Sequence, residues 1–393
     1  MAKSLTKIWL GGLKRLISIQ AKHARDVKRN AARPVRPAGK LSAKLKPVKP
    51  ATTLRSPAKR EAPRPGARES RVRPRAAAWA SGSWTRSFHS APVAPGRLVN
   101  HLQYGLYVPA GAASAPMPLV VMLHGCKQSI DEFAEGTRMN LLADRYGFAV
   151  VYPEQSKHVH AHRCWHWYDS SDAAGGAEAR AVVSLVDELV AEHGFDGERI
   201  YLAGLSAGAG LATLLATRYP ERFAAVAFHS GPAFGEARSG IAAMDVMRRG
   251  MRHDPVVLID EAVDVAAYPG MPAIVIHGDA DHVVAPANAE QLTTQFLRLN
   301  GLVDAAGERI AGEERKAGVV MRDYVRGGRR VVRLCRVQAL GHAWSGGDDA
   351  VPFHSSKGPD ASALIWEFFR YQRRAVKSRE TESIAAGAAS GAA

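Results

Sequence analysis

The sequence lacks the features that mark several large classes of protein. Its 393 residues include only 3 cysteines, too few for a disulfide-rich scaffold. No apolar run reaches the roughly eighteen residues of a transmembrane helix. The Cys and His residues show no zinc-ligand spacing, and we expect no metal and no cofactor. Hydrophobic residues nevertheless make up 46% of the chain, so it can bury a core.

Acidic residues are scarce in the first quarter of the chain. Residues 1–97 contain 24 Lys and Arg against 3 Asp and Glu, which is a net charge of +21. The remaining residues contain 29 bases and 34 acids, which is a net charge of −5. The overall charge of +16 therefore comes from a basic N-terminal arm that precedes a nearly neutral globule.

The basic arm is predicted to have two parts. Apolar residues at helical spacing predict an amphipathic basic helix over residues 1–20. Lys14 and Arg15 interrupt its apolar stretch, so no signal peptide is predicted. Residues 21–97 are rich in Lys, Arg, Pro and Ala and are predicted to be disordered.

Such an arm suits an anionic or apolar surface. The alternatives are a helix that packs on its own globule and a solubilising linker. No aromatic residue lies between Lys22 and Ala78, so the arm offers no platform for stacking bases there. Binding to nucleic acid therefore has weaker support.

Residues 98–374 have the alternating pattern of an α/β catalytic domain. Short apolar runs predict buried parallel strands at 119–123, 148–152, 200–203, 224–228 and 273–276. A helical stripe covers 178–193, and Gly194 is placed to end that helix. Two insertions, 236–268 and 303–330, are candidates to cover a crevice, and residues 375–393 are predicted to be a flexible Ala/Gly-rich tail.

The strongest local signal is Gly204-Leu205-Ser206-Ala207-Gly208. This segment follows a predicted strand and precedes a helical run, which is the setting that a G-x-S-x-G nucleophile elbow requires. Small residues flank the serine because the backbone turns sharply and approaches its neighbours closely. A glycine-rich turn with an incidental serine is the alternative. We predict Ser206 to be a nucleophile.

A serine hydroxyl is a weak nucleophile and needs a base and an orienting acid. In this arrangement they follow along the chain in the order Ser, Asp or Glu, His. Asp279 and Asp281 both follow the strand at 273–276. Asp279 lies in the turn and is a structural candidate, so Asp281 is predicted to be the acid. His342 follows a strand-like run at 330–337 and is predicted to be the base.

Acyl transfer also needs two backbone N–H donors for the oxygen that becomes negative. Ala207 follows the nucleophile at a helix N-terminus and is predicted to supply one. Cys126, in His124-Gly125-Cys126 after the strand at 119–123, is predicted to supply the other. An ordinary glycine turn is the alternative for this second segment.

Seven motifs together resemble a known family. They are His124-Gly-Cys-x-Gln128, Gly136-Thr-Arg-Met-Asn140, Tyr152-Pro-Glu-Gln155, Cys164-Trp-x-Trp167, Gly204-Leu-Ser-Ala-Gly208, His277-Gly-x-x-Asp281 and Gly341-His-Ala-Trp-Ser-Gly-Gly347. Over about residues 98–372 the chain resembles the poly(3-hydroxybutyrate) depolymerase family of esterases. The resemblance implies an α/β-hydrolase fold, with a mostly parallel sheet and helices on both faces. It also implies a triad of Ser206, Asp281 and His342, with the Cys126 and Ala207 N–H groups as the oxyanion hole.

The resemblance has further implications for the site. It places Trp165 and Trp167 near the substrate crevice, and Trp344 of the last motif is another substrate-binding candidate. His166 and Ala209 depart from the family pattern, which usually shows Asn and a second Gly there, and these departures bear on substrate preference. Cys126 and Cys164 both lie in family motifs, which raises the hypothesis of a disulfide between them.

The sequence therefore predicts a serine esterase that hydrolyses 3-hydroxybutyrate polyester or its oligomers. One alternative is a short-chain or carbohydrate esterase of the acetylxylan or feruloyl type. The other is a non-enzymatic protein that anchors granules to nucleic acid. Without a signal peptide we expect a cytoplasmic location, with the arm docked on a polyester granule. An extracellular location, as for many members of the family, is the alternative.

Overall fold

The computed structural model describes residues 80–93, 95, 100–111, 116–304, 307–308, 312–316 and 318–374. The helix predicted at 1–20, most of the segment predicted to be disordered and the tail predicted at 375–393 lie outside these residues.

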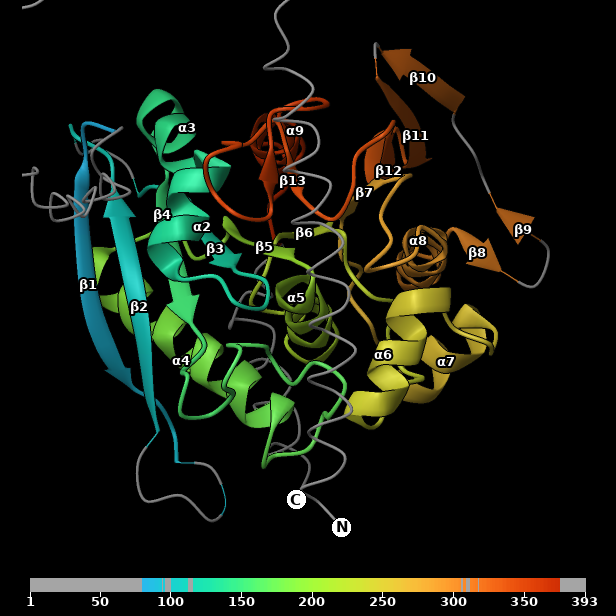
Figure 1. Cartoon of the computed structure of the whole chain (residues 1–393), viewed down its shortest axis with the longest axis horizontal. Coiled ribbons are helices and arrows are strands. Elements are labelled where there is room, and N and C mark those ends of the chain that lie inside the picture. The colour runs from blue at the N-terminus through green and yellow to red at the C-terminus, as the bar shows by residue number, and fades with distance from the viewer. Residues whose placement is uncertain are drawn as a thin grey trace, which may run out of the picture. The chain divides into compact units, whose positions relative to one another are not determined.

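A ten-stranded sheet forms the centre of the described domain (Figure 1). Its strand order is β1-β2-β4-β3-β5-β6-β7-β12-β11-β10. The strands are β1 (Ser83–Ser90), β2 (His101–Val108), β4 (Ala149–Glu154), β3 (Leu119–Leu123), β5 (Ile200–Leu205), β6 (Ala225–His229), β7 (Ala273–Gly278), β12 (Arg329–Val337), β11 (Val319–Arg326) and β10 (Gly312–Lys316). The six strands from β4 to β12 in this order run parallel to one another. The two strands at each end, β1 and β2 and β11 and β10, each pair antiparallel with their neighbours. Two short pairs lie apart from the sheet, β8 (Val303–Asp304) with β9 (Gly307–Glu308) and β13 (Trp344–Ser345) with β14 (His354–Ser355).

Helices cover both faces of the sheet (Figure 1). One face carries α4 (Gly175–His193), α5 (Ala207–Arg218), α6 (Gly240–Arg249), α7 (Pro255–Ala262) and α8 (Ala287–Leu299). The other carries α2 (Ile130–Thr137), α3 (Met139–Tyr146) and α9 (Ala361–Phe369). Both layers are apolar because the central strands are buried on both faces: β3 is buried at every residue, and its alternate side chains enter the two cores. The predicted α/β-hydrolase arrangement of sheet and helices is confirmed for this domain.

The local signals in the sequence have their expected structural counterparts. The strand predicted at 119–123 has those bounds, and the other four predicted strands begin or end within two residues of β4 to β7. Gly194 ends α4 in the left-handed conformation, with φ 66°. Among the described residues, no helix is both long and apolar enough to cross a membrane.

Two segments differ from the predictions. Residues 83–90, predicted to be disordered, form β1, which pairs with all eight residues of β2. Of the residues of this edge strand only His89 is buried, so its sequence carries no apolar run. The strand is held by its pairing with β2 and by contacts of Arg86 and His89 with other elements. Residues 319–326, part of the 303–330 insertion that was a candidate to cover a crevice, form β11 and extend the sheet beside β12.

Candidate active site

The three side chains predicted to form a triad follow three strands that run in the same direction. Ser206 follows β5, Asp281 follows β7, and His342 follows β12. The order β5-β6-β7-β12 places these strand ends next to one another along the sheet. Because parallel strands bring their carboxyl ends to one edge, residues far apart in the sequence converge there.

Ser206 occupies a backbone conformation that side-chain-bearing residues rarely adopt, with φ 56° and ψ −120°. It stands between the last residue of β5 and the first residue of α5. Strained residues of this kind persist where the surrounding structure holds them. Here the Ser206 N–H donates to the carbonyl of His229 on the neighbouring strand, at 3.0 Å. This is the strand–turn–helix geometry of a nucleophile elbow.

The two glycines of the elbow allow this close packing. A Cβ added to Gly208 would lie 2.1 Å from the Leu123 carbonyl oxygen, and one added to Gly204 would lie 2.4 Å from the carbonyl of Gly208. No other residue fits these positions without moving the backbone. The glycines therefore let α5 begin directly against the end of β3, with Ser206 at the edge of the sheet.

Asp281 and His342 are joined by a hydrogen bond of 2.8 Å from Nδ1 of His342 to Oδ2 of Asp281. The other carboxylate oxygen of Asp281 accepts from the N–H groups of Val283 and Val284, both at 2.9 Å. Burial by itself raises the pKa of Asp281, but His342, His277 and the N–H of Val284 together outweigh it, and the pKa is lowered to about 2. The carboxylate is thus ionised and holds Nε2 of His342 as the nitrogen that can accept a proton.

Asp279, the rival acid, has a different partner. Its Oδ1 accepts from the backbone N–H of Ala339 at 2.7 Å. This bond connects the turn after β7 to the turn after β12. His342 is hydrogen-bonded to Asp281 and not to Asp279.

His229 connects the elbow to the loop that carries His342. Its carbonyl accepts from Ser206 N–H, and its Nε2 accepts from the N–H of Ser345 at 3.1 Å. Burial lowers the pKa of His229 well below its ordinary value, so the ring stays neutral and can accept this bond. Among the described residues, the Ser206 hydroxyl itself makes no hydrogen bond to His342. The base is therefore paired with its acid but not with the serine.

The loop predicted to carry the second oxyanion donor lies against the serine. A Cβ added to Gly125 would be 3.4 Å from Cβ of Ser206. In the part of the chain that the structure describes, neither Cys126 nor Ala207 uses its backbone N–H in a hydrogen bond. Both donors are therefore available to a ligand, and the Ala207 N–H gains from the helix dipole of α5.

A disulfide joins Cys126 to Cys164, as hypothesised from the motifs. It closes a segment with a sequence separation of 38 and fastens the loop at Cys126 to the turn that precedes Trp165. Cys335 is free and buried, and burial raises the pKa of its thiol to about 12. Among the described residues, no group of three or more His, Cys, Asp or Glu side chains could hold a metal ion.

The three tryptophans predicted to contact substrate are buried. Trp344 is 0% exposed, its indole N–H donates to Ser362 at 3.1 Å, and its ring stacks on His229. The prediction for Trp344 is therefore wrong in this structure, because no face of its ring is open to a ligand. Trp165 is 1% exposed and donates to the His124 carbonyl at 3.0 Å, which makes it an anchor of the 124–126 segment. Trp167 is 4% exposed and packs against Gly210.

Trp165 and Trp167 border two separate cavities. One has a volume of about 150 Å³ and includes His166 and Glu178 in its wall. The other has a volume of about 480 Å³ and includes Tyr168 and Arg218. Neither wall contains Ser206, Asp281 or His342.

The two positions that depart from the family pattern are both engaged within the protein. His166 contacts Glu178 at 2.6 Å through Nδ1 and donates its backbone N–H to the same carboxylate. Ala209 is 0% exposed and lies against Gly231.

Comparison with known proteins identifies the family of the chain. A family model described as esterase PHB depolymerase matches residues 102–319, more than half of the chain. The chain belongs to this esterase family. It is 36% identical over 206 residues to poly(3-hydroxyalkanoate) depolymerase C of Paucimonas lemoignei, and 31% identical over 208 residues to feruloyl esterase B of Neurospora crassa.

A solved structure supports the fold. The acetyl xylan esterase of Aspergillus awamori superposes on 73% of this chain and on 99% of its own, with a TM-score of 0.57 at 19% sequence identity. The matched region spans 51% of this chain and 49% of the Paucimonas enzyme, so the chain corresponds to about half the length of that relative. It corresponds to 69% of the Neurospora enzyme.

Proposed function

We propose that the chain is a serine esterase that works through an acyl-enzyme, with Ser206, His342 and Asp281 as its triad. The observation that carries the proposal is the 2.8 Å bond from His342 Nδ1 to a buried carboxylate at the edge where the strained Ser206 elbow stands. An imidazole held in this tautomer presents a basic Nε2, which is the state a general base needs.

In the first half of the reaction, Ser206 Oγ bonds to the ester carbonyl carbon while its proton passes to His342 Nε2. The carbonyl oxygen becomes negative and accepts from Cys126 N–H and Ala207 N–H. The intermediate then collapses: the bond to the alcohol oxygen breaks, and His342 donates the proton to that alcohol. In the second half, a water oxygen bonds to the acyl carbon while its proton passes to His342. The bond to Ser206 Oγ then breaks, His342 returns the proton to Ser206, and the carboxylic acid leaves.

Labelling with a fluorophosphonate tests the nucleophile directly. The wild-type chain should gain one phosphonyl group, which peptide mass analysis should place on Ser206. The Ser206→Ala variant should take up none and should lose at least about 10⁴-fold in kcat on p-nitrophenyl esters. Labelling at another serine, or an undiminished rate in Ser206→Ala, contradicts the proposal.

We propose 3-hydroxybutyrate polyester or its oligomers as the substrate, supported by the 36% identity to a poly(3-hydroxyalkanoate) depolymerase. The second candidate is a feruloyl or acetyl ester of xylan, supported by the 31% identity to a feruloyl esterase. A panel of amorphous polyester, 3-hydroxybutyrate oligomers and acetylated or feruloylated xylan separates them by kcat/KM. A higher value on the xylan esters contradicts the first candidate.

We further propose that the basic arm docks the enzyme on a polyester granule, because residues 1–97 carry a net charge of +21. Co-sedimentation of the full chain with granules should weaken as salt rises, since salt screens surface charges. Binding that does not change with salt contradicts an electrostatic dock, and competition by DNA supports a nucleic-acid partner instead.

The Cys126–Cys164 disulfide favours the extracellular alternative, because disulfides persist in oxidising compartments.

A further inference from the structure

The peptide group between Gly125 and Cys126 sets the direction of the candidate oxyanion donor. A trans peptide is planar, so its C=O and its N–H point in opposite directions and move as one unit. The Gly125 carbonyl accepts from Nδ1 of His124 at 2.8 Å and from the N–H of Gln128 at 3.4 Å. Whatever holds this carbonyl therefore aims the Cys126 N–H.

His124 has one tautomer that satisfies its contacts. Its Nε2 accepts from the Gln155 N–H at 3.0 Å, so the proton lies on Nδ1 and is donated to the Gly125 carbonyl. Burial lowers the pKa of His124 to about 4, so the neutral ring persists at ordinary pH. The first bond that holds the peptide is therefore anchored at the end of β4.

Gln128 supplies the second bond and closes the loop on itself. Its side-chain Oε1 accepts from the Gly125 N–H at 2.7 Å, while its own N–H donates to the Gly125 carbonyl. The Gln128 carbonyl accepts from Nη1 of Arg163 at 3.4 Å. Arg163 directly precedes Cys164, whose disulfide holds Cys126 of the same loop.

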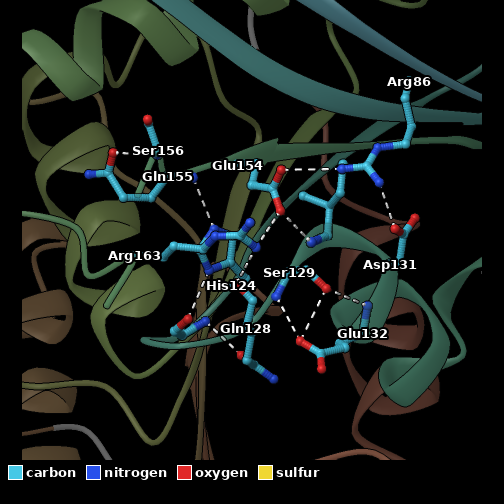
Figure 2. Close-up of polar contacts among 12 residues, drawn as sticks. Arg86, His124, Gln128, Ser129, Asp131, Glu132, Glu154, Gln155, Ser156 and Arg163 are labelled. Carbon is cyan, nitrogen blue, oxygen red and sulfur yellow. Dashed lines mark hydrogen bonds and ion pairs between the residues drawn. The ribbon is translucent and has the colours of Figure 1, made fainter. Parts of the chain in front are cut away.

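The position of Arg163 is set by a buried carboxylate. Nη1 of Arg163 donates to Oε1 of Glu154 at 2.7 Å, and Glu154 is 2% exposed at the last position of β4. Arg86 on β1 contacts the other oxygen at 3.3 Å, and the N–H of Ile130 donates to Oε1 at 3.2 Å. Figure 2 shows Glu154 between Arg86 and Arg163, with Gln128 and His124 on the loop beside them.

We propose that Glu154, acting through Arg163 and Gln128, is a positioning residue that aims the Cys126 N–H at the developing oxyanion. Removing one partner of a buried ion pair leaves an unpaired charge that must find water, which requires a shift of the chain around it. When Arg163 moves, the Gln128 carbonyl bound to it should move as well. The Gly125–Cys126 peptide, which is bonded to Gln128, should then change direction. The inference rests on the proposed esterase function, because only a reaction that forms an oxyanion uses this donor.

The experiment compares Glu154→Gln and Arg163→Met with the wild-type chain on a soluble p-nitrophenyl ester. Loss of a whole oxyanion donor costs about 10²–10³ in kcat, and a misdirected donor should cost part of that, roughly 10-fold to 100-fold. KM should change less than about twofold, because the donor acts on the transition state. Fluorophosphonate labelling of Ser206 should slow in parallel, because the phosphoryl oxygen occupies the same pocket.

Arg163→Lys is the conservative variant. A single nitrogen, Nη1, contacts both Glu154 and Gln128, so an ammonium can replace it in part. Its kcat should lie between those of wild type and Arg163→Met.

Asp323→Asn is the matched control. Asp323 holds the buried Arg333 through two bonds of 2.6 and 2.8 Å on β11 and β12, away from this loop. It should lower the Tm as the Glu154 and Arg163 variants do, yet keep kcat and the labelling rate. A folded Glu154→Gln with unchanged kcat and labelling overturns the inference alone, as does a raised KM with unchanged kcat. A wild-type chain that neither hydrolyses an ester nor takes up the phosphonate overturns the proposed function and the inference together.

Discussion

His342 donates a 2.8 Å hydrogen bond through Nδ1 to Asp281, which lies 61 residues earlier in the chain. The bond exists because β7 and β12 are parallel neighbours whose carboxyl ends meet at one edge of the sheet. It leaves Nε2 of the imidazole as the basic nitrogen. It also distinguishes the role of Asp281 from that of the nearby Asp279, whose carboxylate accepts from a backbone N–H instead. The chemistry proposed for the site depends on this difference.

The two aspartates should respond differently to substitution. Asp281→Asn should lower kcat by about 10⁴-fold, because the amide no longer holds His342 in the basic tautomer. Asp279→Asn should leave kcat within about threefold and lower the Tm, because only the bond to Ala339 N–H is weakened. Steady-state kinetics and thermal melts of both variants decide the matter. The assignment of the acid is reversed if Asp279→Asn shows the larger loss of kcat.

Gly208 should tolerate no side chain. In Gly208→Ala the new methyl would lie 2.1 Å from the Leu123 carbonyl, so α5 must move away from β3, at a cost of about 1–3 kcal/mol in the free energy of unfolding. The shift displaces Ser206 and should lower kcat as well. Gly197→Ala is the control, because nothing lies within 4 Å of its added Cβ. Urea unfolding and kcat should be close to wild type for Gly197→Ala, and equal effects in both variants would refute the explanation.

Reduction of the Cys126–Cys164 disulfide should weaken both stability and activity. With a sequence separation of 38, loss of the cross-link should lower the free energy of unfolding by about 4 kcal/mol in the chain-entropy model. Freed from Cys164, the Cys126 N–H should be less well directed, and kcat should fall more than KM rises. The measurement is ester hydrolysis before and after reduction and alkylation. Cys335 is buried, so native unreduced protein should take up no alkylating agent, and uptake there would contradict the structure.

The folded protein should lose stability as the pH falls from about 6.5 to 4. Burial lowers the pKa of His124 and of His354 from 6.5 to about 4. In this pH range the unfolded chain binds protons that the folded chain excludes, so the free energy of unfolding decreases as pH decreases.

The contribution of one histidine can be isolated. His354 lies with Nδ1 3.0 Å from the Pro352 carbonyl, and His354→Asn can keep that donor without titrating. Thermal melts should show a shallower decline in Tm below pH 6.5 for His354→Asn than for wild type. His158→Asn, at an exposed position, should follow the wild-type curve. A steeper decline in His354→Asn would show that the sign of the effect is wrong.

Much of the domain could be predicted because its signals are local. Apolar runs of strand length, a glycine that ends a helix and the G-x-S-x-G turn each depend on residues close together in the chain, so the central strands, α4 and the elbow at Ser206 follow from pattern alone. The order of Ser206, Asp281 and His342 along the chain likewise needs no coordinates. Strand β1 could not be predicted from the sequence, because an edge strand that buries little apolar surface has no run or alternation of apolar residues.

Pairings between distant residues were decided only by the tertiary structure. Asp281 rather than Asp279 reaches His342, Cys126 meets Cys164, and Glu154 meets Arg163 because the sheet and its loops bring those side chains within bonding distance. The same holds for Trp344. Its motif suggested a contact with substrate, but in the folded chain its side chain is packed in the core. A sequence specifies which groups are present and how the nearby backbone turns, whereas contact depends on how the whole chain is packed.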